Sequence, residues 1–200
     1  MTVIVATHNK FKFMEIKNIL LPYPIHIEQM AYDPLDDVVE DGQTFKDNAI
    51  LKAKHYALKY KKIAIADDSG LIVDQIAPLP GIYSKRYSGL GDLENNIKVL
   101  DCLRHSPNRA AYFVCVIAII FPDGKIFTYE GKLKGEISHT IRGHEGFGYD
   151  PIFIPERQNK TLAELGSNYK IGVSHRRLAL NALLEDINEI INYGRHTRSI

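Results

Sequence analysis

A short apolar run that leads into two adjacent carboxylates constrains this chain more than any other feature. Residues 63–66 read Ile-Ala-Ile-Ala, and Asp67, Asp68 and Ser69 follow them directly. An uninterrupted apolar run of this kind is typical of a strand that is covered on both faces in an α/β sheet. Ligands of such sheets gather beyond the carboxyl ends of the strands. We therefore expect a buried strand that ends at a site, with Asp67 and Asp68 at that end.

The carboxylates of Asp67 and Asp68 leave two interpretations open. Neighbouring side chains on an extended backbone point to opposite sides, so one acid can face a cleft while the other contacts supporting groups. Oxygen ligands of this type suit hard divalent cations. The sequence Asp-Asp-Ser-Gly at 67–70 is equally ordinary turn chemistry. Spacing alone does not decide which of the two acids would contact a metal, and other stretches must decide between a site and a turn.

Composition excludes some classes of function. In 200 residues, 25 Lys and Arg stand against 24 Asp and Glu, so the net charge of +1 gives no electrostatic argument for binding nucleic acid or a membrane. Cys102 and Cys115 do not form a C-x-x-C pair and indicate reduced thiols, with Cys115 in the core. The hydrophobic run from Val3 to Ala6 is too short for a signal sequence or a membrane span. We expect a soluble, cytoplasmic protein.

Two predicted helices begin with positive side chains, although the helix dipole disfavours cations in the first turn. One helix follows the capping residues Thr7 and Asn9 and runs to about Leu21, and the other follows the cap Ser174. The cations of these first turns are Lys10, Lys12, His175, Arg176 and Arg177. Solvated lysines are one interpretation, but local violations of this kind are typical of functional sites. An anion at a helix start would accept hydrogen bonds from the free amides and compensate the charge of the cations. We therefore expect a polyanion bound together with a divalent metal.

The intervening pattern predicts helices alternating with strands. A capping-box-like start at Thr44 precedes a helix on which Asn48 and Lys52 share one face. Asp92 is expected to cap a purely structural helix whose buried face carries apolar residues at helical spacing, namely Leu93, Ile97, Leu100 and Leu103. The longest apolar run, 112–121, turns at Pro-Asp-Gly into a hairpin, so an antiparallel strand joins the sheet. The fold class is therefore α/β, with a mixed sheet flanked by helices.

A glycine-rich stretch at 143–151 is the remaining candidate for ligand contact. Its glycines let the backbone approach a ligand closely, while two aromatic residues, Phe147 and Tyr149, are presented. A hairpin turn, with Phe147 as a core residue beneath it, is the alternative.

Six pieces of the chain, in this order, resemble the Ham1-like or ITPase family of nucleoside-triphosphate pyrophosphatases, and the resemblance covers most of the sequence. The pieces are Thr7-x-Asn9-x-x-Lys12, Glu40-x-Gly42-x-Thr44-Phe45 with Asn48-Ala49 and Lys52-Ala53, Ala66-Asp67-Asp68-Ser69-Gly70-Leu71, Gly146-Phe147-Gly148-Tyr149-Asp150-Pro151, Ala163-Glu164, and Ser174-His175-Arg176. The resemblance implies an elongated α/β fold in which residues 1–200 form a single domain with two lobes around a nucleotide-binding cleft. It also implies a homodimer that hydrolyses ITP, dITP and XTP to the monophosphate and pyrophosphate and so cleanses the nucleotide pool.

The same resemblance implies roles for individual residues. Glu40 and Asp68 would bind Mg²⁺, and Asp68 would also orient or deprotonate the attacking water. The residues implied at the phosphates are Thr7, Asn9, Lys12 and, as a weaker candidate, Lys52. Ser69 would touch the nucleotide and Phe147 would stack on the base. The residues implied to complete the base pocket and its neighbourhood are Gly148, Tyr149, Asp150, Lys170, His175 and Arg176.

The chain departs from the family pattern at three places. The usual Thr-Gly-Asn-x-Gly-Lys reads Thr-His-Asn-Lys-Phe-Lys at 7–12, so His8 and Phe11 replace both glycines. These departures bear on the detailed phosphate hydrogen bonds of the loop more than on the site itself. The Pro-Gly turn at 80–81 lacks the preceding glycines common in the family, and Arg177 stands where a glycine is frequent.

The sequence contains residues that argue against two rival functions. A Maf-type pyrophosphatase, acting on modified pyrimidine or 7-methylguanine nucleotides, is disfavoured by the pieces at 147–150 and 174–176. A non-catalytic nucleotide-binding module would keep the lysines and aromatic residues but has no need of Glu40 and Asp68 together. P-loop and zinc enzymes are excluded because the chain has neither G-x-x-x-x-G-K nor H-E-x-x-H.

Overall fold

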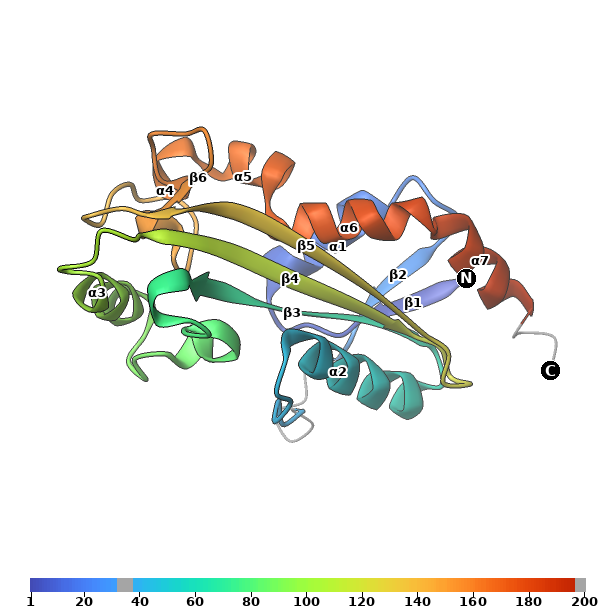
Figure 1. The fold of residues 1–200 in the computed structure, drawn as a ribbon. Coiled ribbons are helices and arrows are strands. Elements are labelled where there is room, and N and C mark those ends of the chain that lie inside the picture. Colours follow the sequence, from blue (N-terminus) through green and yellow to red (C-terminus); the bar gives the residue numbers. More distant parts are fainter. Residues whose placement is uncertain (32–37, 197–200) are drawn as a thin grey trace. The chain divides into compact units, whose positions relative to one another are not determined.

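A mixed six-stranded sheet runs through the computed structural model, which describes residues 1–31 and 38–196 (Figure 1). The strand order is β2-β1-β3-β4-β5-β6. The strands are β1 Thr2–Val5, β2 His26–Gln29, β3 Ile63–Val73, β4 Ala110–Ile120, β5 Ile126–Ile137 and β6 Phe153–Pro155. β1 pairs in parallel with both β2 and β3, whereas β5 and β6 are antiparallel. The predicted α/β class with a mixed sheet is confirmed.

The predicted helices occur in the predicted order, with two differences: an additional short helix covers Ser167–Val173, and the last predicted helix is divided. They are α1 Lys10–Leu20, α2 Phe45–Tyr60, α3 Asp92–Cys102, α4 Leu162–Leu165, α5 Ser167–Val173, α6 His175–Glu185 and α7 Ile187–His196. The last predicted helix is divided at Asp186, whose N–H donates to the carbonyl of Leu183 and whose carboxylate accepts from the Tyr129 hydroxyl at 3.1 Å. Within the described ranges every helix is too short or too polar to cross a membrane.

The chain forms two compact units, each with its own interior. Unit 1 comprises Met1–Asp68, Val116–Glu130 and Ala179–Ile200, and unit 2 comprises Ser69–Cys115 and Gly131–Leu178. The long strands β3, β4 and β5 contribute residues to both units, and the boundary on β3 is the peptide bond between Asp68 and Ser69.

In unit 1, α2 forms as its sequence predicts. Thr44 caps it through a capping box, with its hydroxyl accepting from the Asp47 N–H at 3.1 Å and its own N–H donating to the Asp47 carboxylate at 3.0 Å. The predicted apolar face is buried, including Ala49, Ala53 and Ala57, which are fully inaccessible. Because these side chains are small, α2 can approach its neighbours closely, and its polar face remains available for a site.

In unit 2, α3 differs from the prediction. Gly91, at φ +131°, holds the N-cap position, and Asp92 is the first helical residue. Leu93 and Ile97 were expected on the buried face but are 55% and 45% exposed, whereas Asn96 is only 3% exposed. Val99 and the following Leu103 are fully buried, so α3 buries both amides and apolar side chains. The core itself is apolar and includes Leu71, Val73, Val99, Leu103, Phe113, Ile137, Tyr149, Ile152, Phe153 and Leu162.

Candidate functional site

The two adjacent acids lie in the middle of β3 and not at its end, because β3 continues to Val73. Its parallel pairing with β1, however, runs only from Val3↔Ile63 to Val5↔Ile65. The acids therefore follow the carboxyl end of the shorter strand, β1, and this is the position at which ligands of parallel sheets gather. The prediction that β3 ends at the acids was wrong. The prediction that the acids lie beyond the end of a parallel strand is correct for β1, whose pairing with β3 stops before Asp67.

The acids contact different helices of unit 1, as alternation along a strand predicts. Asp67 Oδ2 lies 2.9 Å from Lys12 Nζ on α1. Asp68 Oδ2 accepts a hydrogen bond from Asn48 Nδ2 on α2 at 3.2 Å, and Asp68 Oδ1 lies 3.5 Å from Lys52 Nζ. Both acids are buried, with 2% and 8% of their surface exposed. The polar face that places Asn48 and Lys52 together is thus aimed at Asp68.

Lys52 lies between the two predicted metal-binding carboxylates, those of Glu40 and Asp68. Its Nζ is 3.0 Å from Glu40 Oε1 as well as 3.5 Å from Asp68 Oδ1. Burial alone would lower the pKa of Lys52, but the carboxylates of Asp68, Asp67 and Glu40 outweigh it and hold this pKa above its ordinary value. Burial also raises the pKa of Asp68, and the charge of Glu40 raises it further, against the opposing effect of Lys52. Three acids, Glu40, Asp67 and Asp68, thus face two ammonium groups, those of Lys12 and Lys52, and the negative charge that is left over can attract a cation.

This donor set fits a hard divalent cation that is completed by its ligand. Among the residues that the structure describes, no three acidic, histidine or cysteine side chains converge closely enough to form an all-protein metal cage. Mg²⁺ is commonly held by one or two carboxylates together with waters and substrate phosphates. Glu40 and Asp68, which share the ammonium group of Lys52, are a pair of this kind.

The predicted phosphate loop is closed by its own side chains. Asn9 Oδ1 accepts from the N–H groups of Phe11 and Lys12 at 2.9 and 3.2 Å, so Asn9 is the α1 cap as predicted. Thr7 Oγ1 accepts from the Asn9 N–H at 3.2 Å. The expectation that these amides are free for an anion is wrong, because the cap residues already use them. An anion here would depend on the Lys12 ammonium and on the hydroxyl and amide groups of the loop.

In unit 2, Phe147 lies at the surface of the glycine-rich loop. Phe147 is 41% exposed, and Lys170 Nζ lies 4.0 Å from the centre of its ring. Its N–H donates to Asp150 Oδ2 at 2.9 Å, and the same oxygen accepts from Lys170 Nζ at 2.5 Å. Phe147 is therefore not the core residue that the alternative interpretation required.

Asp150 is the buried acceptor that joins the Phe147 N–H and the Lys170 ammonium group. It is 1% exposed, and burial raises its pKa in spite of the nearby Lys170 ammonium group. Its Oδ1 is buried and makes no hydrogen bond within the described residues. A ligand that brings a donor to Oδ1 would satisfy it.

Tyr149 lies in the core, contrary to the expectation that both aromatic residues of the loop are presented. It is 4% exposed, its hydroxyl donates to the Ser84 carbonyl at 2.8 Å, and burial raises its pKa. Gly148, at φ +63°, turns the backbone between the two rings. Phe147 and Tyr149 therefore have different environments, and only Phe147 is accessible.

The start of α6 brings Arg176 to Ser69 within unit 2. Arg176 is 2% exposed, and its Nη2 donates to Ser69 Oγ at 3.3 Å. His175, 6% exposed, stacks on Phe113 with a ring-centre distance of 4.9 Å and an interplanar angle of 13°. The Ser174 hydroxyl accepts from the Arg177 N–H at 3.0 Å, which confirms Ser174 as the predicted cap. Helix α6 thus begins with a buried imidazole stacked on an aromatic ring and a buried guanidinium bonded to a hydroxyl.

Sequence reasoning missed two residues that hold the Phe147 loop. Asp92 and Asn96 of α3, treated as parts of a structural helix, both bond the backbone of Gly148. The available signal was their i, i+4 spacing, which places two polar side chains on one helix face.

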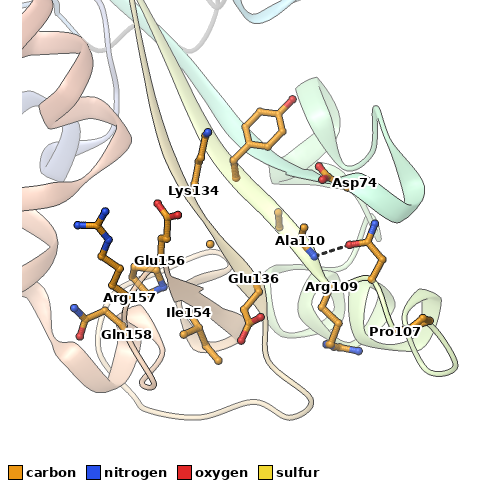
Figure 2. Close-up of a pocket in the computed structure, with 15 residues that line it drawn as sticks. Asp74, Pro107, Arg109, Ala110, Lys134, Glu136, Ile154, Glu156, Arg157 and Gln158 are labelled. Atoms are coloured by element: carbon orange, nitrogen blue, oxygen red, sulfur yellow. Dashed lines mark hydrogen bonds between the residues drawn. The ribbon is translucent and has the colours of Figure 1, made fainter.

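A separate hollow of about 800 Å³ occurs in unit 2, and no predicted site residue lines it (Figure 2). It is bordered by parts of β4, β5 and β6. The Arg109 guanidinium at its edge donates to the carbonyls of Ile137 at 2.6 Å, Leu103 at 3.1 Å and Ser138 at 2.5 Å. Arg109 is therefore committed to the fold and is not arranged to bind an anion.

A family model described as the Ham1 family matches residues 3–186. The chain belongs to the Ham1 family. The predicted family resemblance is thereby confirmed, and the match extends over both units of the structure.

Individual Ham1 proteins are similar to this chain over nearly its whole length. A dITP/XTP pyrophosphatase of Acholeplasma laidlawii is 54% identical, with 98% of each chain covered. The dITP/XTP pyrophosphatase of Bacillus subtilis is 43% identical over 90% of this chain and 93% of its own. Among solved structures, a Staphylococcus aureus Ham1 protein is 40% identical with a TM-score of 0.86, covering 94% of this chain and 98% of its own. A HAM1 protein from Coxiella burnetii reaches a TM-score of 0.88 at 36% identity, with 94% and 99% covered.

Proposed function

We propose that this Ham1-family chain hydrolyses the non-standard purine nucleoside triphosphates ITP, dITP and XTP to the monophosphate and pyrophosphate. The observation that carries the proposal is the cluster of Glu40, Lys52 and Asp68, in which a partly exposed and a buried carboxylate share one ammonium group at 3.0 and 3.5 Å. Such a cluster suits a phosphate group and its cation. Support for the substrate class comes from the relatives named dITP/XTP pyrophosphatase, one of them 54% identical over 98% of both chains.

Unit 1 residues act on the triphosphate in this proposal. Glu40 and Asp68 hold Mg²⁺, which supplies charge neutralisation on the phosphate oxygens. Lys12 and Lys52, which neutralise buried acids in the structure, also neutralise phosphate oxygens, while Thr7 and Asn9 complete the phosphate loop.

Asp68 orients the attacking water or accepts its proton. The raised pKa of Asp68, caused chiefly by burial, makes this carboxylate a better proton acceptor than an exposed aspartate. Asn48, which donates to Asp68 Oδ2 at 3.2 Å, leaves Asp68 Oδ1 to face Lys52. Water then attacks the α-phosphorus, and pyrophosphate leaves.

Unit 2 residues recognise the base. Phe147 stacks on it, while Lys170 and Arg176 supply hydrogen-bond donors and the buried Asp150 Oδ1 supplies an acceptor. Ser69 touches the nucleotide. The base pocket and its neighbourhood are completed by Gly148, Tyr149 and His175. Donors that bond the 6-oxo group of hypoxanthine or xanthine would face the N6 hydrogens of adenine and would be left without an acceptor. Because unpaired buried donors cost free energy, this mismatch favours 6-oxopurines over adenine.

The finer parts of the proposal are the metal identity, the assembly and the location. Mg²⁺ as the cofactor, a homodimer, a cytoplasmic location and residues 1–200 as one catalytic domain all rest on the family resemblance. EDTA treatment followed by addition of Mg²⁺ or Mn²⁺ tests the metal, and light scattering with size-exclusion chromatography tests the dimer.

A substrate panel tests the reaction directly. The purified protein is incubated with Mg²⁺ and ITP, dITP, XTP, ATP or GTP, and pyrophosphate and orthophosphate are measured separately. We expect equimolar monophosphate and pyrophosphate from the first three. Release of orthophosphate, or turnover only of modified pyrimidine or 7-methylguanine nucleotides as a Maf-type enzyme would give, contradicts the proposal. Tight ITP binding without turnover would instead indicate a non-catalytic module.

Substitutions in unit 2 should separate stacking from hydrogen-bond selection. Phe147→Ala is expected to raise KM for ITP and for residual ATP by similar factors, since stacking is worth roughly 1–3 kcal/mol and tolerates any base. Arg176→Ala should instead narrow the preference for ITP over ATP. Steady-state kinetics with both nucleotides measure the effect, and Arg177→Ala on the same helix turn is the control. Because Phe147 is 41% exposed, its truncation should leave the melting temperature nearly unchanged. A large melting-temperature loss with an unchanged KM would refute the platform role.

A further inference from the structure

Helix α3 holds both backbone hydrogen-bonding groups of a single residue in the base loop. Asp92 Oδ2 accepts from the Gly148 N–H at 2.7 Å, and Asn96 Nδ2 donates to the Gly148 carbonyl at 2.9 Å. Asp92 and Asn96 are one helical turn apart, so both side chains leave the same face of α3. One turn of helix therefore fixes the two peptide groups that flank Gly148.

The neighbouring Phe147 ring depends on this backbone for its position. It is 41% exposed, so core packing does not hold it as it holds a buried ring. Gly148 adopts φ +63°, a conformation that other residues rarely adopt. On the other side, the Phe147 N–H donates to Asp150 Oδ2 at 2.9 Å. Three hydrogen bonds thus bracket the peptide that carries the ring.

The burial pattern of α3 indicates that polar contacts orient this helix. It buries Asn95 and Asn96 at 2% and 3% exposure while Leu93 and Ile97 remain 55% and 45% exposed. Asn95 bonds the loop that precedes the helix, accepting from the Ser88 N–H at 2.6 Å. Burial of an amide costs free energy unless its hydrogen bonds compensate. Val99 of the same helix is fully buried in the core, so α3 combines an apolar contact with two buried amides whose hydrogen bonds go to neighbouring loops.

We propose that Asp92 and Asn96 are positioning residues for base recognition, which hold Gly148 so that the Phe147 ring is presented to a purine base. This inference rests on the proposed function for the identity of the ligand. It assigns no contact between α3 and the substrate, because both side chains act through the loop backbone.

Kinetics of α3 variants provide the first test. Asp92→Ala and Asn96→Ala are each expected to raise KM for ITP about three- to tenfold with kcat changed less than twofold, since each removes one hydrogen bond that orders the platform. Asp92→Asn keeps an acceptor oxygen and should recover most of the loss. Glu94→Ala is the matched control, because Glu94 is the other acidic residue in the first turn of α3. An equal rise in KM for Glu94→Ala would overturn the proposal in favour of a general effect on helix stability.

A fluorescence measurement tests the same contact without any nucleotide. The chain contains no tryptophan, so Phe147→Trp places a single reporter on the loop. In this background, Asp92→Ala and Asn96→Ala should lower the steady-state anisotropy and increase acrylamide quenching, whereas Glu94→Ala should change neither. Unchanged anisotropy in both variants would refute the positioning role, whatever the substrate proves to be.

The two measurements also separate this inference from the proposed function. A fall in anisotropy without a rise in KM for ITP, in a protein that hydrolyses ITP, would overturn the link to base recognition. If the parent protein hydrolyses no purine triphosphate, the proposed function fails and base recognition fails with it, while the anisotropy still decides whether α3 orders the loop.

Discussion

Asp68→Asn is expected to lower kcat for ITP by about a hundred- to ten-thousandfold, the range that a positioned general base contributes. The substitution removes one carboxylate charge from the pair that includes Glu40, and it removes the group that faces Lys52 at 3.5 Å. Pyrophosphate release under saturating ITP measures the effect. Asp67→Asn is measured beside it and should have the smaller effect on kcat, since Asp67 contacts Lys12, whereas Asp68 shares Lys52 with Glu40. Activity of Asp68→Asn within tenfold of wild type would contradict the assigned role.

The same substitution should not lower the melting temperature. Burial raises the pKa of Asp68 in the folded state, so the folded protein favours the protonated carboxyl more than the unfolded chain does. Stability from such a group is present at low pH and is lost as pH rises through the folded pKa. At pH 8 the ionised carboxylate therefore opposes folding through its own burial, but it also favours folding through Lys52, whose pKa it raises. Because the neutral Asn removes both effects, thermal melts at pH 8 should show a nearly unchanged melting temperature, and a clear decrease would show that Asp68 is mainly structural.

Lys12→Ala is expected to weaken triphosphate binding and also to destabilise the fold. Its Nζ lies 2.9 Å from Asp67 Oδ2, and the Asp67 side chain is 1% exposed. Loss of one partner from a buried ion pair costs about 3–5 kcal/mol, and we expect the lower end because 19% of the Lys12 side chain is exposed. Chemical denaturation measures the stability, and Lys10→Ala, on the same helix turn, is the control.

Two further comparisons separate the roles of Lys12. Binding of ITP should weaken more than binding of inosine, since the proposed contact is with phosphate, and equal losses would contradict that role. The double variant Lys12→Met with Asp67→Asn replaces the ion pair by neutral groups of similar size. It should recover most of the stability without recovering affinity for ITP. Recovery of both would show that Lys12 serves only to neutralise Asp67.

Features governed by neighbours in sequence were predicted correctly. Asn9, Thr44 and Ser174 cap the helices that their positions indicate, because a cap depends on amides two or three residues away. The shared face of Asn48 and Lys52 follows from the geometry of one helical turn. Motif order was sufficient to indicate the Ham1 family.

Predictions that required knowledge of distant partners failed. Helix α3 has an apolar spacing that predicts Leu93 and Ile97 on the inside, yet two amides that bond other segments are buried there beside Val99. Tyr149 was expected at the surface beside Phe147, but its hydroxyl finds the Ser84 carbonyl in the core. Periodicity reports which residues share a face and not which face the rest of the chain covers.

The sequence by itself determined the α/β class, the helix caps and the motif residues that mark the family. Only the tertiary structure decided how the charges of those residues are compensated: Lys12 by Asp67, Lys52 by Glu40 and Asp68. It also brought Arg176 to Ser69 across 107 positions of the chain. The physical reason is that a cap or a helix face is fixed by bonds within a few residues, whereas ion pairs and buried hydrogen bonds form between segments that only the folded sheet and its helices bring together.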